Sequence, residues 1–262
     1  MMNKTLDLNC DMGEGFGVYS AGDDAALLAH VTSANIACGF HAGDPGTMAR
    51  TVRLARQHGV AVGAHPGLPD LQGFGRREMA LSPDEAYEAV VYQIGALQGV
   101  AAAAGTRLAH VKPHGALYNM AARDARLSEA IARAVRDVDP SLILYALAGS
   151  VTVQTARGLG VHVACEVFGD RSYQDDGTLT PRRLPGAMIT DLQQTVAQVR
   201  RMVHDGHVRS LSGREIPIEA HTVCLHGDQP GALEFVVGLS GALRADGIEL
   251  RAPTLQDLQD SL

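Results

Sequence analysis

The chain repeats one local pattern along most of its length: a short apolar run is followed by a longer stretch with the periodicity of a helix. This alternation is typical of parallel β-strands joined by crossover helices. The apolar runs predict seven strands, at residues 5–10, 33–37, 60–64, 108–111, 142–146, 162–165 and 222–225. We predict helices at residues 23–31, 46–59, 82–105, 127–138, 191–206 and 229–247. No low-complexity linker interrupts this order, so we expect one domain that spans residues 1–262.

The pattern inside each strand distinguishes a closed barrel from an open sheet. Side chains alternate between the two faces of a strand. In "TLDLNCD" the residues that alternate from Leu6 are apolar or cysteine, whereas those that alternate from Asp7 are polar. A strand in a doubly wound sheet is covered by helices on both faces and is apolar throughout, but a barrel strand can carry polar groups inside. We therefore predict an α/β fold, a single-domain parallel (β/α) barrel with about seven strands. The pattern leaves open whether there is an eighth strand.

The composition excludes several classes of protein. With 262 residues and 46% hydrophobic content, the chain is long enough for one large core. The formal net charge of −7, without a basic stripe, predicts that no nucleic acid and no membrane surface is a partner. No apolar window approaches a membrane span and no secretory signal is evident, so we expect a cytoplasmic protein. The four cysteines form no C-x-x-C pair, which favours reduced thiols.

Polar residues gather directly after the predicted strands. The stretch "HVKPHG" places Lys112 and His114 on the interior face at the end of the fourth strand. Because barrel enzymes build their sites at the carboxyl ends of the strands, we predict that the site lies at this rim. The stretches that follow the other strands are "NCDMGEG", "ACGFHAGDP", "GAHPG", "ALAGS", "CEVFGDRSY" and "CLHGDQPGA".

The residue types at this rim suit the hydrolysis of an amide. Lys112 carries a positive charge that can stabilise a developing oxyanion or a phosphoryl oxygen, and an interior lysine needs a charged partner or a ligand. Histidines exchange protons near neutral pH, and carboxylates orient them or accept a proton from water. The histidine candidates are His41, His65, His114 and His226, and the carboxylate candidates are Asp11, Asp44, Glu166 and Asp228.

Other polar residues have structural explanations. His110 and His162 lie deeper in their strands, and we expect both to be hydrogen-bonded core residues. For Asp7 we favour a buried anchor for neighbouring N–H groups.

Three further segments carry weaker signals. The chain has no G-x-x-x-x-G-K-[ST] loop, and "GEGFG" is a weak phosphate-binding signal that is equally typical of a flexible turn. The long polar segment 168–187, with Arg171 and Tyr173, predicts a lid over the substrate. The stretch 210–219 predicts a small hairpin that decorates the barrel or meets a partner.

Six phrases of the sequence resemble one known family. They are "DLNCDMGEGFG", "ANIACGFHAGDP", "VGAHPG", "VKPHGALYN", "EVFGDRSY" and "LHGDQPGA", which are similar to the LamB/YcsF family in the family's order, from about residue 5 to residue 250. The resemblance implies a barrel related to the glycoside hydrolase/deacetylase fold. It also implies cleavage of 5-oxo-L-proline to L-glutamate coupled to ATP hydrolysis, with ATP as the co-substrate accompanied by Mg²⁺, and 5-oxoprolinase subunits B and C as partners.

The resemblance and the rim chemistry together assign roles. The catalytic candidates are Lys112, His114, His65, Glu166 and Asp11. The substrate-binding or nucleotide-binding candidates are Asn9, Glu14, Gly15, His41, Asp44, Arg171, Tyr173, His226 and Asp228.

Two other functions stay open. One is a metal-dependent deacetylase or amidohydrolase that acts on a carbohydrate or another amide, with Asp11, His41 and His65 as the candidate metal ligands. The other is a non-catalytic subunit that binds a sugar or a lactam. The sequence also leaves open which subunit binds ATP and whether the chain forms a homo-oligomer.

Overall fold

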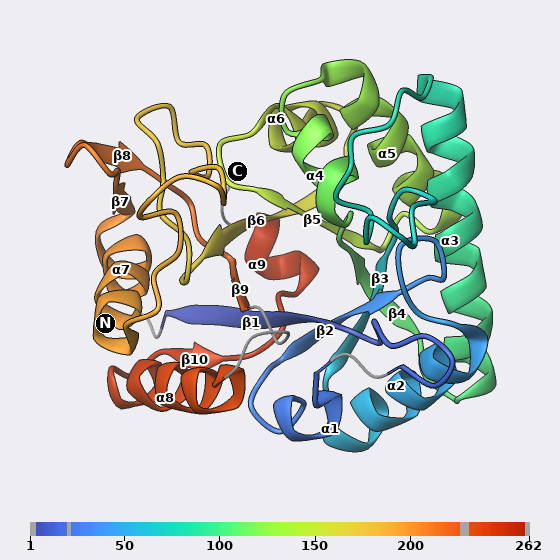
Figure 1. The fold of residues 1–262 in the computed structure, drawn as a ribbon, viewed down its shortest axis with the longest axis horizontal. Helices are drawn as coiled ribbons and strands as arrows, with labels where there is room; N and C mark the ends of the chain where they lie inside the picture. Colours follow the sequence, from blue (N-terminus) through green and yellow to red (C-terminus); the bar gives the residue numbers. More distant parts are fainter. Residues whose placement is uncertain (1–3, 20–21, 226–230, 260–262) are drawn as a thin grey trace.

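The computed structural model describes residues 4–19, 22–225 and 231–259, and its centre is a closed barrel of parallel strands (Figure 1). The strands follow the order β1-β2-β3-β4-β5-β6-β9, and β9 pairs back with β1. They are β1 (Thr5–Met12), β2 (Ser33–Ala37), β3 (Ala61–His65), β4 (Leu108–Val111), β5 (Ile143–Leu147), β6 (His162–Phe168) and β9 (Thr222–Leu225). The predicted seven-stranded barrel is confirmed. The short strand β10 (Glu249–Leu250) pairs with the first residues of β1.

Helices surround the barrel (Figure 1). They are α1 (Asp24–Leu27), α2 (Pro45–His58), α3 (Pro83–Ala103), α4 (Gly115–Ala121), α5 (Ala125–Val138), α6 (Val151–Gly158), α7 (Leu192–Asp205), α8 (Ala232–Ala245) and α9 (Leu255–Gln259). Local signals set their ends: Ser82 and Glu85 form a capping box before α3, and Gly59 ends α2 with a left-handed backbone. The sequence pattern misses α4, α6 and α9 because such short helices show too few turns of periodicity.

The two faces of the barrel strands differ as the alternation predicts. Leu8 and Val62 point outward and are buried beneath the helices, with 0% and 2% of their surface exposed. The inward face is polar, and its side chains form a hydrogen-bonded column. Asn9 and Asn35 lie at mid-height, where the Asn35 amide donates to the Asn9 carbonyl oxygen at 2.7 Å. The inside of the barrel is therefore a packed polar core.

The lower part of this column satisfies its own polar groups. The carboxylate of Asp7 accepts hydrogen bonds from the hydroxyls of Thr32, Ser33 and Thr222, at 2.5, 2.7 and 2.6 Å. The prediction that Asp7 is a buried structural residue is confirmed. The predicted donors were N–H groups, and that part is wrong, because the donors are hydroxyls. His110 contacts the oxygen of Asn35 at 2.8 Å, as expected of a core histidine.

Smaller elements lie at the two ends of the barrel. At the amino-terminal end, Leu258 of α9 packs against Ile143, Tyr145 and Ala164. At the other end is a hairpin, the antiparallel pair β7 (His207–Arg209) and β8 (Glu215–Pro217). It overlaps the predicted stretch 210–219, but its first strand begins three residues earlier.

Two other sequence predictions can be compared with this fold. All four cysteines are buried and none forms a disulfide. No helix in the described part of the chain combines the length and the apolar character that a membrane span requires.

Candidate active site

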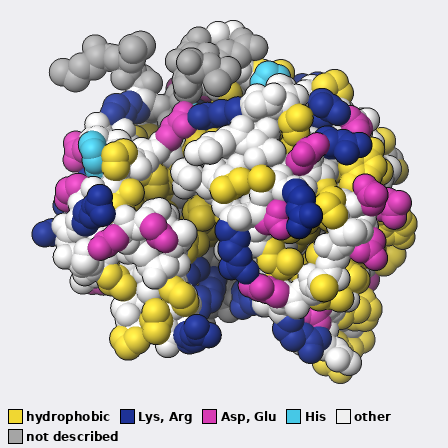
Figure 2. Space-filling view, turned by 90° about the horizontal axis from the view of Figure 1, so that it is seen from above, with side chains coloured by type: hydrophobic (Ala, Val, Ile, Leu, Met, Phe, Trp, Pro, Cys, Tyr) yellow, Lys and Arg dark blue, Asp and Glu magenta, His cyan; other side chains and the backbone are white. Residues whose placement is uncertain are grey.

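A cavity of about 790 Å³ opens over the carboxyl ends of the strands. Figure 2 views this side of the molecule and shows a hollow with Lys and Arg side chains in and around it. Five of the predicted site residues line the cavity: Asp11, His65, Lys112, His114 and Arg171. Pockets of roughly 300–1,000 Å³ typically hold drug-sized ligands, so the space suffices for a small substrate with a second group beside it.

Lys112 lies at the floor of this cavity with 3% of its surface exposed. Its Nζ atom is 2.9 Å from Asp11 Oδ1 and 2.9 Å from Glu166 Oε1, and it donates to Asn9 Oδ1 at 3.1 Å and to Cys224 Sγ at 3.0 Å. Burial alone would lower the pKa of Lys112, but Asp11 and its other acidic neighbours hold it well above its usual range. The lysine is therefore a fixed buried cation.

Asp11 connects the lysine to His65 at the end of β3. One carboxylate oxygen accepts from Lys112 and from the amide of Asn35 at 2.8 Å, and the other lies 3.3 Å from His65 Nε2. Burial would raise the pKa of Asp11, but His65 and Lys112 hold it well below its usual range. Asp11 also lines the cavity, so a carboxylate and an ammonium group stand side by side at its floor.

Glu166 lies beneath this floor and is fully buried. Its Oε1 accepts from Asn9 at 2.9 Å besides contacting Lys112, and its Oε2 accepts from the Tyr118 hydroxyl at 2.6 Å. Tyr118 lines the cavity and was missed by sequence reasoning. The sequence holds one signal for it: Tyr118 comes four residues after His114, and residues four apart lie on the same side of a helix. That signal could not be used, because the short helix α4 was not predicted.

His65 and His114 face each other across a short distance. His65 Nδ1 lies 2.7 Å from the carbonyl oxygen of Lys112, and His114 Nε2 lies 2.8 Å from that of Phe74. A carbonyl oxygen only accepts, so each of these ring nitrogens carries the proton. In the neutral rings the other nitrogens, His65 Nε2 and His114 Nδ1, are then unprotonated, and they lie 2.9 Å apart.

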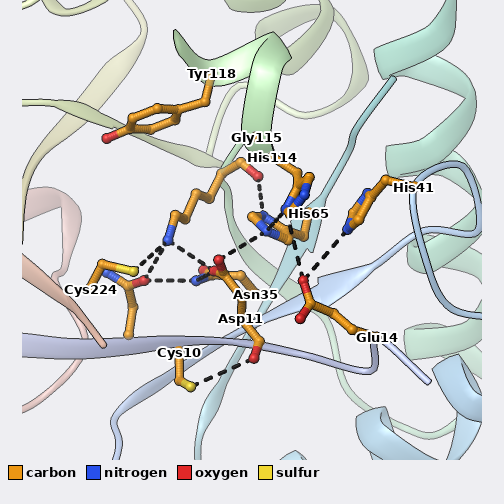
Figure 3. A network of polar contacts seen from close by, with 12 residues as sticks. Cys10, Asp11, Glu14, Asn35, His41, His65, His114, Gly115, Tyr118 and Cys224 are labelled. Atoms are coloured by element: carbon orange, nitrogen blue, oxygen red, sulfur yellow. Dashed lines mark hydrogen bonds and ion pairs between the residues drawn. The ribbon is translucent and has the colours of Figure 1, made fainter. Parts of the chain in front are cut away.

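His41 completes the histidine group from the loop after β2. Its ring stacks on that of His114 with centroids 3.7 Å apart, and its Nε2 lies 3.8 Å from Glu14 Oε1 (Figure 3). Burial holds the pKa of His41 well below its usual value and lowers the pKa of His114 to about 3. Glu14, His41, His65 and His114 each offer a ligand atom, and these atoms lie within 4.8 Å of one another.

The remaining candidates of the first strands lie beside the cavity or beneath it. Asp44 caps α2 and also accepts from the N–H of Gly17, and these bonds to backbone N–H groups hold its pKa well below the usual range. The N–H of Gly13 already donates to Asp24 at 2.9 Å. Two carboxylates thus occupy the N–H groups on either side of Gly15, which disfavours a phosphate at this loop.

The predicted lid, segment 168–187, forms one wall of the cavity. Arg171 lines it and donates to the carbonyl of Thr180 at 2.6 Å. Tyr173 is fully buried, and its hydroxyl accepts from the N–H of Phe168 at 2.9 Å, so it holds the segment in place. His226 and Asp228 lie outside the described residues.

Three further arginines line the cavity and were not singled out from the sequence: Arg76, Arg123 and Arg182. They come from different segments that the fold brings together. Since each lies in a loop with no periodic signal, only the three-dimensional arrangement identifies them. Together with Arg171 they make the cavity wall basic, which suits an anionic ligand.

Comparisons with known proteins agree with this description. Residues 6–258 match the LamB/YcsF family. The A subunit of 5-oxoprolinase from Bordetella pertussis (strain Tohama I) is 61% identical over 251 residues, which covers 96% of this chain and 100% of that protein. The crystal structure of a lactam utilization protein from Thermus thermophilus has a TM-score of 0.91 and 49% identity, and it covers 95% of this chain and 100% of the other.

The expected relation to deacetylase barrels holds for the fold. The structure of T48 deacetylase with substrate has a TM-score of 0.50 at 14% identity, covering 99% of this chain and 92% of the other. The match over residues 6–258 and the relative at 61% identity show that the chain belongs to the LamB/YcsF family.

Proposed function

We propose that the chain is the A subunit of an ATP-dependent 5-oxoprolinase, which cleaves 5-oxo-L-proline to L-glutamate in a cytoplasmic complex with subunits B and C. The observation that carries this proposal is a buried lysine cation at the floor of a basic cavity, in a chain that is 61% identical to a protein of that name. ATP is the co-substrate, with Mg²⁺, and the chain's own family and fold support the lactam as the substrate.

The lactam must be made electrophilic before water can open it. An unstrained amide resists attack, and its carbonyl oxygen gains negative charge as the tetrahedral intermediate forms. In the proposed mechanism Lys112 faces that oxygen, or a phosphoryl group transferred to it, and stabilises the charge. Glu166 and Asn9 lie beneath the floor and are positioning residues that hold the ammonium group, and the Tyr118 hydroxyl in turn holds Glu166.

Water activation is assigned to the carboxylate side of the floor. Asp11 lines the cavity next to Lys112, and His65 contacts its second oxygen. This places a proton acceptor within a few ångströms of the cation that faces the carbonyl, which is the arrangement that attack by water requires. His114 extends this row of contacts, because its Nδ1 atom lies 2.9 Å from His65 Nε2.

The basic wall is assigned to the anionic groups. The carboxylate of 5-oxoproline and a phosphoryl group both suit arginine, because its guanidinium forms paired hydrogen bonds to either. The cavity is much larger than a small lactam, so it leaves room for a phosphoryl donor or for a segment of a partner protein. The carboxylates around Gly15 disfavour nucleotide binding at that loop.

Reconstitution tests this function. The purified chain should release little glutamate from 5-oxoproline, whereas the chain with subunits B and C should form glutamate and ADP together. Omitting ATP or any one of the three chains should abolish the product. Robust turnover by the isolated chain without ATP, or none by the complete assembly, would contradict the proposal.

A metal-dependent amidohydrolase is the second candidate, favoured by the carboxylate and histidines that converge at one point. Under that alternative the isolated chain would hydrolyse an N-acetylated sugar or a simple amide with a divalent metal and without ATP. The same purified preparation, assayed with and without metal, distinguishes the two functions.

A further inference from the structure

We propose that Glu14, His41, His65 and His114 bind one divalent first-row transition metal ion, with Zn²⁺ as the best match to their donor atoms. The site lies at the edge of the cavity. Metal binding there requires neither ATP nor the proposed cleavage of the lactam. Four features of the described residues support it: an unsatisfied buried histidine, two histidine nitrogens that face each other at 2.9 Å, the spacing of the ligand atoms, and the packing that fixes the rings.

His41 is the first feature. Its side chain is 0% exposed, and neither ring nitrogen has a hydrogen-bond partner among the residues that the structure describes. A buried polar group without a partner costs free energy, so such groups are rare in folded proteins. The nearest acidic atom is Glu14 Oε1, 3.8 Å from Nε2, which is too far for a hydrogen bond. A metal ion between these two atoms would give the buried ring the partner that it lacks.

The facing pair of nitrogens is the second feature. His65 and His114 each place one ring nitrogen at 2.7 and 2.8 Å from a backbone carbonyl, to which it donates, so that in the neutral ring the other nitrogen carries a lone pair. These lone pairs point toward one another at 2.9 Å. Two lone pairs repel at that distance unless a proton or a cation lies between them. Histidine ligands of metals almost always donate their second N–H to a carbonyl or carboxylate in this way.

The spacing is the third feature. Zinc binds histidine nitrogen and carboxylate oxygen at about 2.0–2.2 Å, so two ligand atoms on one tetrahedral ion lie roughly 3.4 Å apart. The separations here are 2.9 Å between His65 Nε2 and His114 Nδ1, and 3.8 Å from Glu14 Oε1 to each of His114 Nδ1 and His41 Nε2. Shifts of a few tenths of an ångström would bring these pairs to that spacing. Three imidazoles and one carboxylate suit zinc and its neighbours rather than Mg²⁺ or Ca²⁺.

Two glycines keep the histidine rings in place. A Cβ atom on Gly67 would lie 2.4 Å from His41 Nδ1, and one on Gly75 would lie 2.7 Å from His41 Cβ and 2.9 Å from His114 Cδ2. Only glycine therefore permits the backbone to approach the stacked rings so closely. The ligands are held by packing before any ion arrives, which lowers the cost of binding.

A shared proton between His65 and His114 is the competing explanation. Asp11 lies 3.3 Å from His65 Nε2 and would stabilise the charge. That explanation accounts for two rings but leaves both nitrogens of His41 unsatisfied, whereas a metal ion gives each of the three rings a partner and leaves only His41 Nδ1 unsatisfied. The ion also explains why Glu14, from the loop after β1, lies against the histidines of other strands.

A second group of possible ligands, Cys165, Glu219 and His221, serves as the internal control. Glu219 already accepts from Arg157 at 2.9 Å and from the Cys165 thiol at 3.1 Å. Its ligand atoms are thus already hydrogen-bonded, and we assign no metal to it. Glu219→Gln should leave metal binding unchanged.

The experiment uses the full chain after dialysis against a chelator. Zn²⁺ titration followed by calorimetry, and metal content by mass spectrometry, should give about one ion per chain. His41→Gln should weaken Zn²⁺ binding at least about 100-fold, since loss of even an outer partner of a ligand typically costs 10–100-fold. Glu219→Gln and His58→Gln, at an exposed histidine, should bind as the wild type does. Co²⁺ should give the visible bands of a four-coordinate site in the wild type and lose them in His41→Gln.

Two results would overturn the proposal. One is less than about a tenth of an ion bound per wild-type chain at micromolar Zn²⁺; the other is a folded His41→Gln variant with unchanged affinity and Co²⁺ spectrum. If His41→Gln does not fold, Glu14→Gln replaces it with the same two criteria, because its side chain is partly accessible. Since no substrate, nucleotide or partner protein enters these measurements, failure of the proposed 5-oxoprolinase activity would leave their outcome unaffected.

Discussion

Replacing Lys112 separates the catalytic role of its charge from its structural role. Lys112→Met keeps the length of the side chain but leaves the fully buried carboxylate of Glu166 without its cation, which lies 2.9 Å away. Removing one partner of a buried pair typically costs about 3–5 kcal/mol. For a chain of this size each kcal/mol shifts the melting temperature by about 2–4 °C, so we expect a drop of roughly 6–20 °C.

The double variant Lys112→Met/Glu166→Gln removes that structural cost. The amide of the glutamine keeps the contacts to Asn9 and Tyr118 without a buried charge, so the stability lost at Glu166 should return. The loss at Asp11 remains, because that carboxylate keeps only Asn35 and His65 as partners among the described residues. Activity should not return, because loss of one such electrostatic contact costs on the order of 10²–10³ in rate. Thermal unfolding of the chain and glutamate release by the reconstituted complex are the two assays, with Glu166→Gln alone as the matched control.

The reasoning fails on either of two results. If Lys112→Met melts with the wild type, the ion pair contributes nothing to the fold. If the stable double variant turns over at nearly the wild-type rate, the charge of Lys112 does not act on the substrate, and the assignment of the cavity floor is wrong.

Three further variants test other parts of the structure. Val62→Asp places an unpaired charge under the helices and should prevent folding; a soluble variant with an unchanged melting temperature would mean that the strand faces are reversed. Asp257 pairs with Arg251 at 2.6 Å, and this contact lowers the pKa of Asp257 in the folded state below its unfolded value near 4. The pair therefore stabilises the fold above that pH, and this stabilisation is lost as the pH falls. The difference in urea unfolding between wild type and Asp257→Asn should therefore be larger at pH 7 than at pH 3, and a difference that grows in acid would refute it. Arg182→Ala should raise KM for 5-oxoproline about 10–100-fold with kcat nearly unchanged, and an unchanged KM would remove this arginine from substrate binding.

The fold could be predicted because its signals are local. Alternation within each strand separates an apolar face from a polar one, and the polar face marks the inside of a barrel. Val62 is buried beneath helices and Lys112 points inward, as that pattern requires. Short helices such as α4 escaped because their few turns leave no periodic signal, and Tyr118 was missed with them.

The site could be predicted only in part, because its contacts join segments that are far apart in the sequence. The pattern placed Lys112 and Asp11 on the same rim, but it could not show that they meet at 2.9 Å. The glycine-rich loop after β1 suggested phosphate binding, whereas the fold turns its N–H groups toward carboxylates and its Glu14 toward three histidines. Barrel closure, which no local pattern encodes, decides such contacts.

A crystal structure of the assembled enzyme with 5-oxoproline bound tests the central claim most directly. The account predicts the lactam in the cavity over the barrel, with its carbonyl oxygen within hydrogen-bond distance of Lys112 Nζ and its carboxylate toward the arginines of the wall. Well-defined 5-oxoproline bound elsewhere in the assembly, with this cavity closed to it, would contradict the account.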